Sequence, residues 1–338
     1  MGKYLVTGVA GFVGAHLARR LLLNGHEVVG VDNLDSAYDR RLKMHRFGWL
    51  DGLDGFTFYE RNILDLNADY FKNRYGVFDA ILHLAGRAGV RQSVADPMGY
   101  IGDNVLGQVR MLDLVRRGVA SRLVYASSSS VYTPTFAGDG ELTDGARGLE
   151  PSRVDFPFIA DAPRTPYAAS KRAIELIAEA YARSYDVPSL GLRFFSVYGP
   201  AGRPDSRASV FQYVRQVAEG LPITVYSPLE QRRDFTHIDD VVRVIVAEAE
   251  RDPSKTFPVA DLMNVGSGRP ERVVDVIEGV ARILGKKAAI EQVTDPRTDT
   301  AFTYSTPLPF EPVPLEVGLR GAVNWYLENR AWAREVAP

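Results

Sequence analysis

The stretch Gly8-Val9-Ala10-Gly11-Phe12-Val13-Gly14 decides the fold of this 338-residue chain. It joins a strand-like run, Tyr4–Val6, to a helical run, Phe12–Leu23. Glycines three residues apart let backbone N–H groups approach a pyrophosphate, and the N-terminus of the next helix adds partial positive charge. A tight strand-to-helix turn would also use glycine, but this is the context that a dinucleotide site requires. We therefore assign Gly8, Gly11, Phe12, Val13 and Gly14 to a cofactor.

An acidic residue follows at the end of the second strand-like run, Glu27–Val31. Asp32 lies eighteen residues after Gly14, where a carboxylate can accept hydrogen bonds from the adenine-ribose hydroxyls. The same charge would repel a 2′-phosphate, so the pattern favours NAD over NADP. The alternative is that Asp32 only forms a turn before Asn33.

Two further loops lie where the cofactor should pass. Asp65 follows the third strand-like run and is a candidate for the adenine edge. Leu84, Ala85 and Gly86 close the fourth run, where small residues such as Ala85 and Gly86 let a cofactor approach. His83, just before them, is interpreted as a core histidine rather than a catalytic one.

Short apolar runs alternate with helical runs, which predicts an α/β fold with a doubly wound parallel sheet of the Rossmann type. We expect an NAD-binding domain over residues 1–190, with returning segments near 190–198 and 236–250. A smaller, interleaved substrate lobe would occupy mainly residues 199–338, and Pro307–Pro314 should be an extended connector. The other expected strands are Phe56–Tyr59, Ala80–Leu84, Leu123–Ala126 and Leu190–Phe195; the expected helices are Tyr100–Arg117, Pro166–Tyr185, Val210–Glu219 and Val273–Leu284.

Composition excludes several classes of function. Forty Lys+Arg against forty-two Asp+Glu give a net charge of −2, so we expect no nucleic-acid or acidic-membrane partner. The chain has no cysteine, which excludes disulfides, thiolate metal sites and cysteine nucleophiles. Five scattered histidines suggest no metal site. Without a long apolar run or a secretory signal, a cytoplasmic protein is expected.

Tyr167 and Lys171 form a candidate proton-handling pair. Pro166 suits a first helical turn, and the i, i+4 spacing puts both side chains on one helix face. A tyrosine pKa near 10 must fall by about three units to supply a base near neutrality, which takes roughly 4 kcal/mol. A lysine ammonium and an oxidised nicotinamide can provide it. Surface packing is the alternative interpretation of this pair. Ser127–Ser130, at the end of the fifth strand, offer a hydroxyl to the substrate; the alternative is a flexible polar loop.

Several segments together resemble the extended short-chain dehydrogenase/reductase superfamily of nucleotide-sugar enzymes, and most closely its UDP-glucuronate 4-epimerases. The resemblance implies that Tyr167 is the base, Lys171 its electrostatic partner and Ser128 the hydroxyl on the reacting oxygen. It also implies that a carboxylate-binding set and two further arginines hold the substrate. The matching segments are Ala88–Arg91, Ser127–Tyr132, Tyr167–Lys171, Gly191–Asp205 and Arg232–Asp240; the carboxylate set is Ser129, Ser130, Ser196 and Arg203, with Arg233 on the diphosphate and Arg91 also on the substrate.

Residues 128–130 separate this chain from its relatives within that resemblance. Related 4,6-dehydratases place Thr-Asp-Glu there, and decarboxylases that make UDP-xylose carry glutamate at the last position. This chain has Ser-Ser-Ser, which leaves no acid there to promote elimination. Two departures from the family remain: Gly86-Arg87 replaces Ala-Gln, and Arg297-Thr298-Asp299 replaces Pro-Gly-Asp near the expected uridine.

The expected function is therefore NAD-dependent 4-epimerisation of a UDP-hexuronic acid, UDP-glucuronate to UDP-galacturonate, through a transient 4-keto sugar. The alternatives are a 4-epimerase of a neutral or acetamido UDP-hexose and a non-catalytic NAD-binding regulator. The resemblance also implies a homodimer, formed through Tyr100–Arg117 and Pro166–Tyr185.

Overall fold

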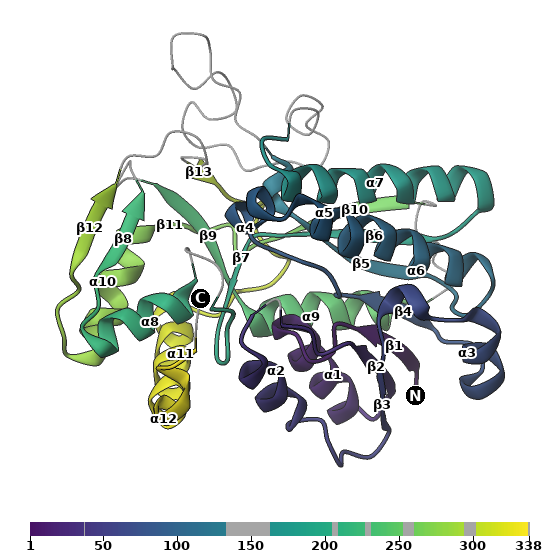
Figure 1. Ribbon diagram of the computed structural model, residues 1–338, viewed down its shortest axis with the longest axis horizontal. Helices are drawn as coiled ribbons and strands as arrows, with labels where there is room; N and C mark the ends of the chain where they lie inside the picture. The colour runs from purple at the N-terminus through teal and green to yellow at the C-terminus, as the bar shows by residue number, and fades with distance from the viewer. Residues whose placement is uncertain are drawn as a thin grey trace, which may run out of the picture. The chain divides into compact units, whose positions relative to one another are not determined.

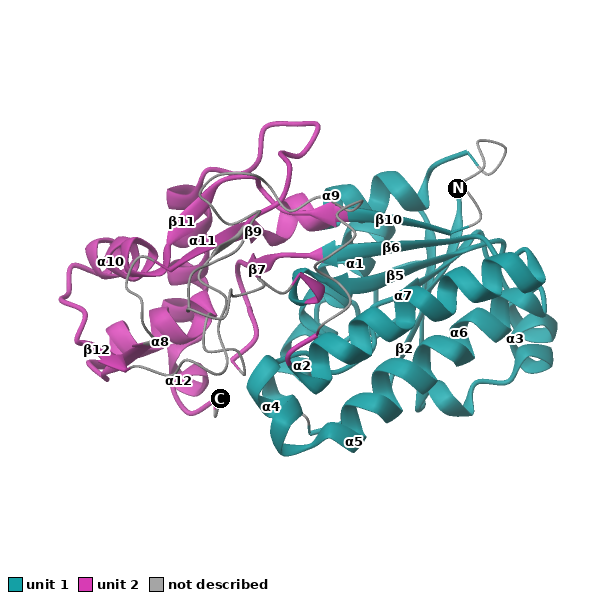
Figure 2. Cartoon of the chain, turned by 90° about the horizontal axis from the view of Figure 1, so that it is seen from above, with its two compact units in different colours: residues 1–130, 165–193, 242–263 teal, residues 131–164, 194–241, 264–338 magenta. Residues whose placement is uncertain are grey.

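The computed structural model describes residues 1–36, 38–132, 163–204, 209–226, 231–252, 260–293 and 302–336. The chain divides into two compact units (Figure 2). Unit 1 comprises residues 1–130, 165–193 and 242–263, and unit 2 comprises residues 131–164, 194–241 and 264–338. Asp205 and Arg297–Asp299, which the sequence singled out, lie outside the described residues.

Unit 1 is built on a seven-stranded sheet of order β10-β6-β5-β4-β1-β2-β3. The pairs β1–β2, β2–β3, β1–β4 and β4–β5 are parallel. The strand order reverses between β1 and β4, and ligands of such sheets bind beyond the carboxyl ends of the strands at that point. The predicted doubly wound sheet is confirmed. The strands are β1 (Lys3–Thr7), β2 (Glu27–Asp32), β3 (Phe56–Glu60), β4 (Ala80–His83), β5 (Leu123–Ser128), β6 (Ser189–Phe194) and β10 (Ala260–Val265).

Helices cover both faces of this sheet. On one face, buried residues of α3, α6 and α7 form a core cluster with strand residues that include Leu5, Ile81 and Leu123. Helix α1 packs against β1 and β2. The helices of unit 1 are α1 (Phe12–Leu23), α2 (Arg40–Phe47), α3 (Ala68–Tyr75), α4 (Val90–Ala95), α5 (Pro97–Tyr100), α6 (Gly107–Arg116), α7 (Pro166–Tyr185) and most of α9 (Ile238–Ala249).

The helix predicted over Tyr100–Arg117 needs correction. Helix α5 ends at Tyr100, a π-helix, η2, follows over Ile101–Leu106, and only then does α6 begin. π-Helical turns are rare and occur frequently at functional sites. Hydrophobic periodicity indicates a helix here but does not distinguish the wider turn.

Among the described residues, unit 2 contains a four-stranded sheet and a two-stranded sheet. Its central strand β9 pairs with β11 antiparallel and with β13 and β7 parallel, and β8 pairs with β12. Helices α8 and α10 have the predicted bounds, and both pack against α11 (Figure 1). Residues 307–314 carry no helix or strand, as predicted. The elements are β7 (Ser196–Tyr198), α8 (Val210–Glu219), β8 (Ile223–Tyr226), β9 (Arg232–His237), β11 (Pro270–Arg272), α10 (Val273–Leu284), β12 (Ile290–Val293), β13 (Phe302–Thr303), α11 (Leu315–Glu328) and α12 (Arg330–Ala333).

Two segments were expected to return to the first domain, and the structure gives each a different kind of element. Residues 190–198 carry β6 and β7, whereas residues 236–250 form the end of β9 and helix α9. The strand that closes the sheet edge beside β6 is β10, which the sequence analysis did not anticipate. None of the described helices is both long and apolar enough to cross a lipid bilayer.

Candidate active site

The glycine turn after β1 closes only without side chains. Gly8 has φ +69°, and a Cβ there would stand 2.7 Å from the backbone nitrogen of Ala85. A Cβ on Gly11 or Gly14 would lie 2.8 or 2.1 Å from the carbonyl oxygen of Gly8. The glycines are thus needed first for the packing of the turn itself. Because α1 begins without a side-chain cap or an acidic residue in its first turn, its N-terminus fits a pyrophosphate.

Asp32 is buried at the end of β2 and holds two parts of the turn region. Its carboxylate accepts hydrogen bonds from the backbone N–H groups of Ala10, at 3.1 Å, and Leu34, at 2.8 Å. Leu34 has a positive φ of 50°, which is uncommon outside glycine. The carboxylate is therefore fixed beside the cradle, where the sequence places a ribose ligand.

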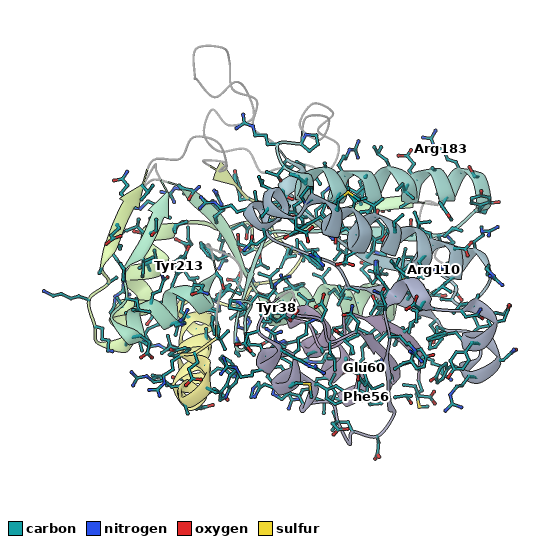
Figure 3. All side chains as sticks on the ribbon, in the orientation of Figure 1. Tyr38, Phe56, Glu60, Arg110, Arg183 and Tyr213 are labelled. Atoms are coloured by element: carbon teal, nitrogen blue, oxygen red, sulfur yellow. The ribbon has the colours of Figure 1, made fainter. Side chains whose placement is uncertain are left out.

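Helix α2 carries two buried cations that the sequence did not reveal, and Lys43 lies beside Asp32. The buried Lys43 ammonium lies 3.5 Å from Asp32 Oδ1 and 2.5 Å from Asp35 Oδ1. Burial opposes its charge, but these two carboxylates raise the pKa of Lys43. Arg46 is fully buried and donates to the hydroxyl of Tyr38, labelled in Figure 3, at 2.7 Å. The strongly polar sequence of α2 conceals these residues, because it resembles an exposed helix.

The carboxyl end of β4 is tied to β1. His83 Nδ1 lies 2.7 Å from Thr7 Oγ1, which also accepts a hydrogen bond from the Ala85 N–H at 3.3 Å. The N–H of Leu84 donates to the Thr7 carbonyl at 3.2 Å. Burial, aided by the nearby Lys171 charge, lowers the pKa of His83 to about 3. His83 is therefore the neutral core histidine that the sequence predicts.

Tyr167 and Lys171 lie on the first turns of α7 and are both buried, at 8% and 7% exposure. Thr165 caps the helix by accepting from the Ala168 N–H, and Pro166 is its first residue. The Lys171 ammonium donates to the carbonyl of Ala126 in β5 at 2.8 Å. Surface packing, the alternative interpretation of this pair, does not fit such burial.

The serines that end β5 are ordered by hydrogen bonds rather than forming a flexible loop. Ser128 Oγ accepts from the N–H and the hydroxyl of Ser130, at 3.1 and 2.9 Å. Ser127 donates to Glu175 at 2.6 Å, and Glu175 forms a bidentate pair with the buried Arg193 at 2.8 Å. Ser129 begins the 3₁₀ turn η3 (Ser129–Val131).

Asn104, on the π-helix, is a second polar residue that the sequence did not reveal. It is buried and donates to Ser170 Oγ at 2.9 Å and to the Arg87 carbonyl at 3.0 Å. The side-chain oxygen Oδ1 of Asn104 accepts from the Arg87 N–H at 2.8 Å. Asn104 thereby connects α7, which carries Tyr167, to the loop after β4. No local pattern indicated it, because other polar residues such as Asp103 and Gln108 lie in the same segment.

Two predicted ligands in unit 1 lie on short elements. Asp65 is exposed at the end of the 3₁₀ turn η1 (Ile63–Asp65), where its N–H donates to the Asn62 carbonyl at 3.0 Å. Arg91 is half-buried on α4. The structure leaves both assignments as predictions.

In unit 2, Arg203 lies on a strained loop that follows β7 and Ser196. Ala201 is buried with φ +53°, a conformation that persists where the surroundings impose it, often at functional sites. The Ser209 hydroxyl donates to the Arg203 carbonyl, and the Gln212 amide donates to the Pro204 carbonyl at 2.5 Å. The start of α8 thus fixes the backbone of this loop.

Arg233 is buried on β9 and donates to the Arg232 carbonyl at 2.8 Å. Its neighbour Asp234 has no exposed surface and accepts from the N–H groups of Ser267, Gly268 and Ser305, at 2.7 to 3.0 Å. One carboxylate therefore ties two loops to the strand that presents Arg233. Among the residues that the structure describes, no three acidic or histidine side chains gather as a metal ion would need.

Comparisons with known proteins agree with this geometry. A model of the NAD dependent epimerase/dehydratase family matches residues 4–266. A UDP-glucuronate 4-epimerase of Thermodesulfobacterium geofontis is 36% identical over 343 residues, which cover 97% of each chain. The crystal structure of a Bacillus cereus UDP-glucuronic acid 4-epimerase with UDP-glucuronic acid and NAD has a TM-score of 0.84 at 27% identity, covering 97% of this chain and 99% of that one.

A Thermus thermophilus UDP-glucose 4-epimerase in complex with NAD has a TM-score of 0.77 at 27% identity, covering 96% of this chain and 99% of that one. Structural likeness therefore extends to enzymes named for a neutral sugar as well as for an acidic one. The full-length sequence matches and the family model agree on the wider group: this chain belongs to the NAD dependent epimerase/dehydratase family.

Proposed function

We propose that this protein is an NAD-dependent 4-epimerase that interconverts UDP-glucuronate and UDP-galacturonate. One observation carries the proposal: Tyr167 and Lys171 are buried together on α7, and Lys171 donates to Ala126, just before the two serines that end β5. A UDP-glucuronate 4-epimerase that is 36% identical over nearly the whole chain supports the choice of substrate.

The cofactor's residues follow from the cradle. Gly8, Gly11 and Gly14, with the N–H groups of Phe12 and Val13, would hold the pyrophosphate, and Asp32 the adenine ribose. Leu84 and Ala85 would line the cofactor's path, and Asp65 would meet the adenine edge. These residues would hold NAD, which would supply an acceptor for the hydride of the sugar's C4 and a donor for its return. The buried charge of Asp32 disfavours the 2′-phosphate of NADP.

The chain's own residues handle the proton. Tyr167 removes the proton of the C4 hydroxyl as a ketone forms at that carbon, and it gives the proton back when the ketone is reduced. The Lys171 ammonium favours the phenolate. Ser128 holds the C4 oxygen by a hydrogen bond throughout. The sugar must turn between the two half-reactions, so that its other face is reduced.

The carboxylate of the substrate needs its own ligands. We assign Ser129, Ser130, Ser196 and Arg203 to it, because a guanidinium and hydroxyls form charge-assisted hydrogen bonds with a carboxylate. Arg233 would bind the diphosphate, and Arg91 is a further substrate ligand.

Tight binding of the substrate carboxylate should also slow the loss of CO2 from the 4-keto intermediate. The 4-keto hexuronate is a β-keto acid, which can lose CO2, and residues 128–130 provide no acid to promote elimination. We expect Arg203→Ala to raise KM for UDP-glucuronate and to increase the UDP-pentose by-product. Unchanged KM with no pentose would remove Arg203 from the carboxylate site.

We further propose that two copies pair through the predicted segments Tyr100–Arg117 and Pro166–Tyr185, together with the neighbouring helices α4 and α5. The occupant we assign to this surface is a second copy of the chain, since the surface combines exposed apolar residues with neighbouring helices. Light scattering after gel filtration should give a dimer, and Met98→Asp should give monomers; a monomeric wild type would refute the pairing. The exposed apolar residues of this surface are Val94, Met98, Ile101, Leu106 and Leu176.

We also propose a cytoplasmic location, which cell fractionation would test.

The function is tested by incubating the protein with UDP-glucuronate, UDP-glucose and UDP-N-acetylglucosamine, followed by chromatographic separation of stereoisomers. The proposal predicts UDP-galacturonate from the first and little product from the others. Preferred turnover of a neutral or acetamido sugar would replace the proposal by that alternative. NAD binding without turnover of any sugar would favour a regulator.

A further inference from the structure

We infer that Arg87 is a positioning residue that clamps the loop after β4, residues 84–89, onto the helical segment 96–104. The inference rests on the proposed function for its role in the reaction. Arg87 stands where the family has glutamine, beside the expected nicotinamide. A Cβ on its neighbour Gly86 would lie 4.0 Å from Lys171 Nζ, so this loop borders the proton-handling pair.

The clamp has two ion pairs and a set of backbone bonds. Arg87 Nε lies 2.5 Å from Asp103 Oδ2, and Nη1 lies 2.6 Å from Asp96 Oδ2. Asn104 bonds both the N–H and the carbonyl of Arg87, as described above. The Tyr100 hydroxyl donates to the Ala88 carbonyl at 2.9 Å. Five contacts thus join one short loop to one helical segment.

Glycines at two positions make room for these contacts. A Cβ on Gly99 would stand 2.5 Å from Arg87 Nη1 and 2.3 Å from Asp96 Oδ2. A Cβ on Gly86, which has φ +149°, would stand 2.6 Å from Asn104 Oδ1. Side chains at either glycine would push the clamp apart.

The π-helix η2 supplies two consecutive ligands of the clamp, Asp103 and Asn104. One binds the guanidinium and the other binds the backbone of the same residue, Arg87. π-Helical turns concentrate at functional sites. Holding Arg87 is the role that we infer for this π-helix. The hydrogen bond and charge of Asp103, with the charge of Asp96, raise the pKa of Arg87 against burial. The guanidinium pairs with these two carboxylates, so we do not assign it to an anionic ligand.

The helical segment also contacts the catalytic candidates. The ring of Tyr100 meets the ring of Tyr167 edge-on, with centroids 5.9 Å apart, and Asn104 bonds Ser170 on the same helix as Tyr167. The clamp therefore holds the nicotinamide-side loop and α7 to one support. A loosened loop should weaken NAD binding and let the keto sugar escape before it is reduced again.

The test compares Arg87→Gln and Asp103→Asn with a matched control, Arg116→Gln. Arg116 pairs with Asp113 at 2.6 Å on α6 and is similarly accessible to solvent, but it lies outside the clamp. The first measurement is the Kd for NAD by calorimetry, without any sugar. The second is hydrogen exchange of the amides of residues 84–89. The third is the reduced-nicotinamide absorbance that remains after turnover.

We expect each clamp variant to raise the NAD Kd about tenfold, as the loss of a charged hydrogen bond typically does. The double variant should be no worse than the worse single one, and exchange of residues 84–89 should accelerate. Reduced nicotinamide should accumulate with UDP-glucuronate. If Arg87→Gln matches Arg116→Gln in Kd and in exchange, the clamp is refuted.

These readouts separate the clamp from the proposed function. A wild-type protein that binds NAD but converts no UDP-sugar would refute the function, while the Kd and exchange data would still decide the clamp. Arg87→Lys serves as a second variant, since one ammonium cannot reproduce the fork that bonds both carboxylates. It should give a Kd between those of the wild type and Arg87→Gln; a Kd as low as that of the wild type would contradict bidentate clamping.

Discussion

Replacing Gly8 by alanine tests the close approach that builds the cofactor cradle. Gly25, after α1, offers a matched control because both glycines have positive φ, +69° and +82°. A Cβ on Gly25 would meet nothing within 4 Å, whereas a Cβ on Gly8 would stand 2.7 Å from the nitrogen of Ala85 and 2.8 Å from its Cα. The two substitutions therefore share backbone strain and differ in the steric overlap.

The magnitudes follow from that difference. A side chain in the left-handed region costs roughly 1–2 kcal/mol, so Gly25→Ala should lower the free energy of unfolding by that amount. Gly8→Ala adds an overlap with backbone atoms, and such overpacking costs about 1–3 kcal/mol more. Relief of the overlap must move the turn or the β4 loop, and losing one hydrogen bond to the pyrophosphate would weaken NAD binding about tenfold.

Urea unfolding and NAD calorimetry on both variants give the answer. We expect Gly25→Ala to keep the wild-type Kd for NAD and Gly8→Ala to raise it at least tenfold, with the larger loss of stability. Equal Kd values and equal unfolding free energies for the two variants would refute the reasoning, because the contact with Ala85 would then have no energetic consequence.

Three further predictions concern the site and its support. Tyr167→Phe should reduce kcat by more than 10²-fold in a steady-state assay while NAD still binds, since general-base catalysis contributes that much; a wild-type rate would exclude Tyr167 as the base. Burial lowers the pKa of His83 from 6.5 to about 3. As far as His83 is concerned, the folded protein is therefore most stable above pH 6.5, where the ring is neutral in both states, and it loses stability as the pH falls from 6.5 toward 3. Between pH 7 and 5 the wild type should lose about 2 kcal/mol more unfolding free energy than His83→Asn, and parallel pH profiles would contradict this. Glu175→Gln, which leaves the buried Arg193 guanidinium without its ion pair, should cost about 3–5 kcal/mol in urea unfolding; the exposed control Glu179→Gln should cost less than about 1 kcal/mol, and similar losses would refute the distinction.

The sequence predicts the parallel sheet well because its strands are short, apolar and separated by helical runs. The strand after β4, for example, is expected over Leu123–Ala126 and extends over Leu123–Ser128. Strand β10 escaped prediction because its sequence, Ala-Asp-Leu-Met-Asn-Val, alternates weakly. Pairing beside β6 supplies the stabilisation that the local sequence does not indicate.

The candidate site likewise contains residues that the sequence predicts and residues that it does not. Residues with a fixed spacing, such as Tyr167 and Lys171, could be predicted because a helix places them on one face. Lys43, Asn104 and the partners of Arg87 could not, because their contacts join elements that are separate in sequence. No local pattern indicates a π-helical turn either, since its hydrophobic periodicity does not differ clearly from that of an α-helix.

The central claim is that a hydride leaves C4 of the sugar and returns to the same carbon. It is tested most directly with UDP-glucuronate that carries deuterium at C4, converted in ordinary water and analysed by mass spectrometry and NMR. We predict UDP-galacturonate that retains the deuterium at C4. Product in which solvent hydrogen has replaced the deuterium would contradict the account.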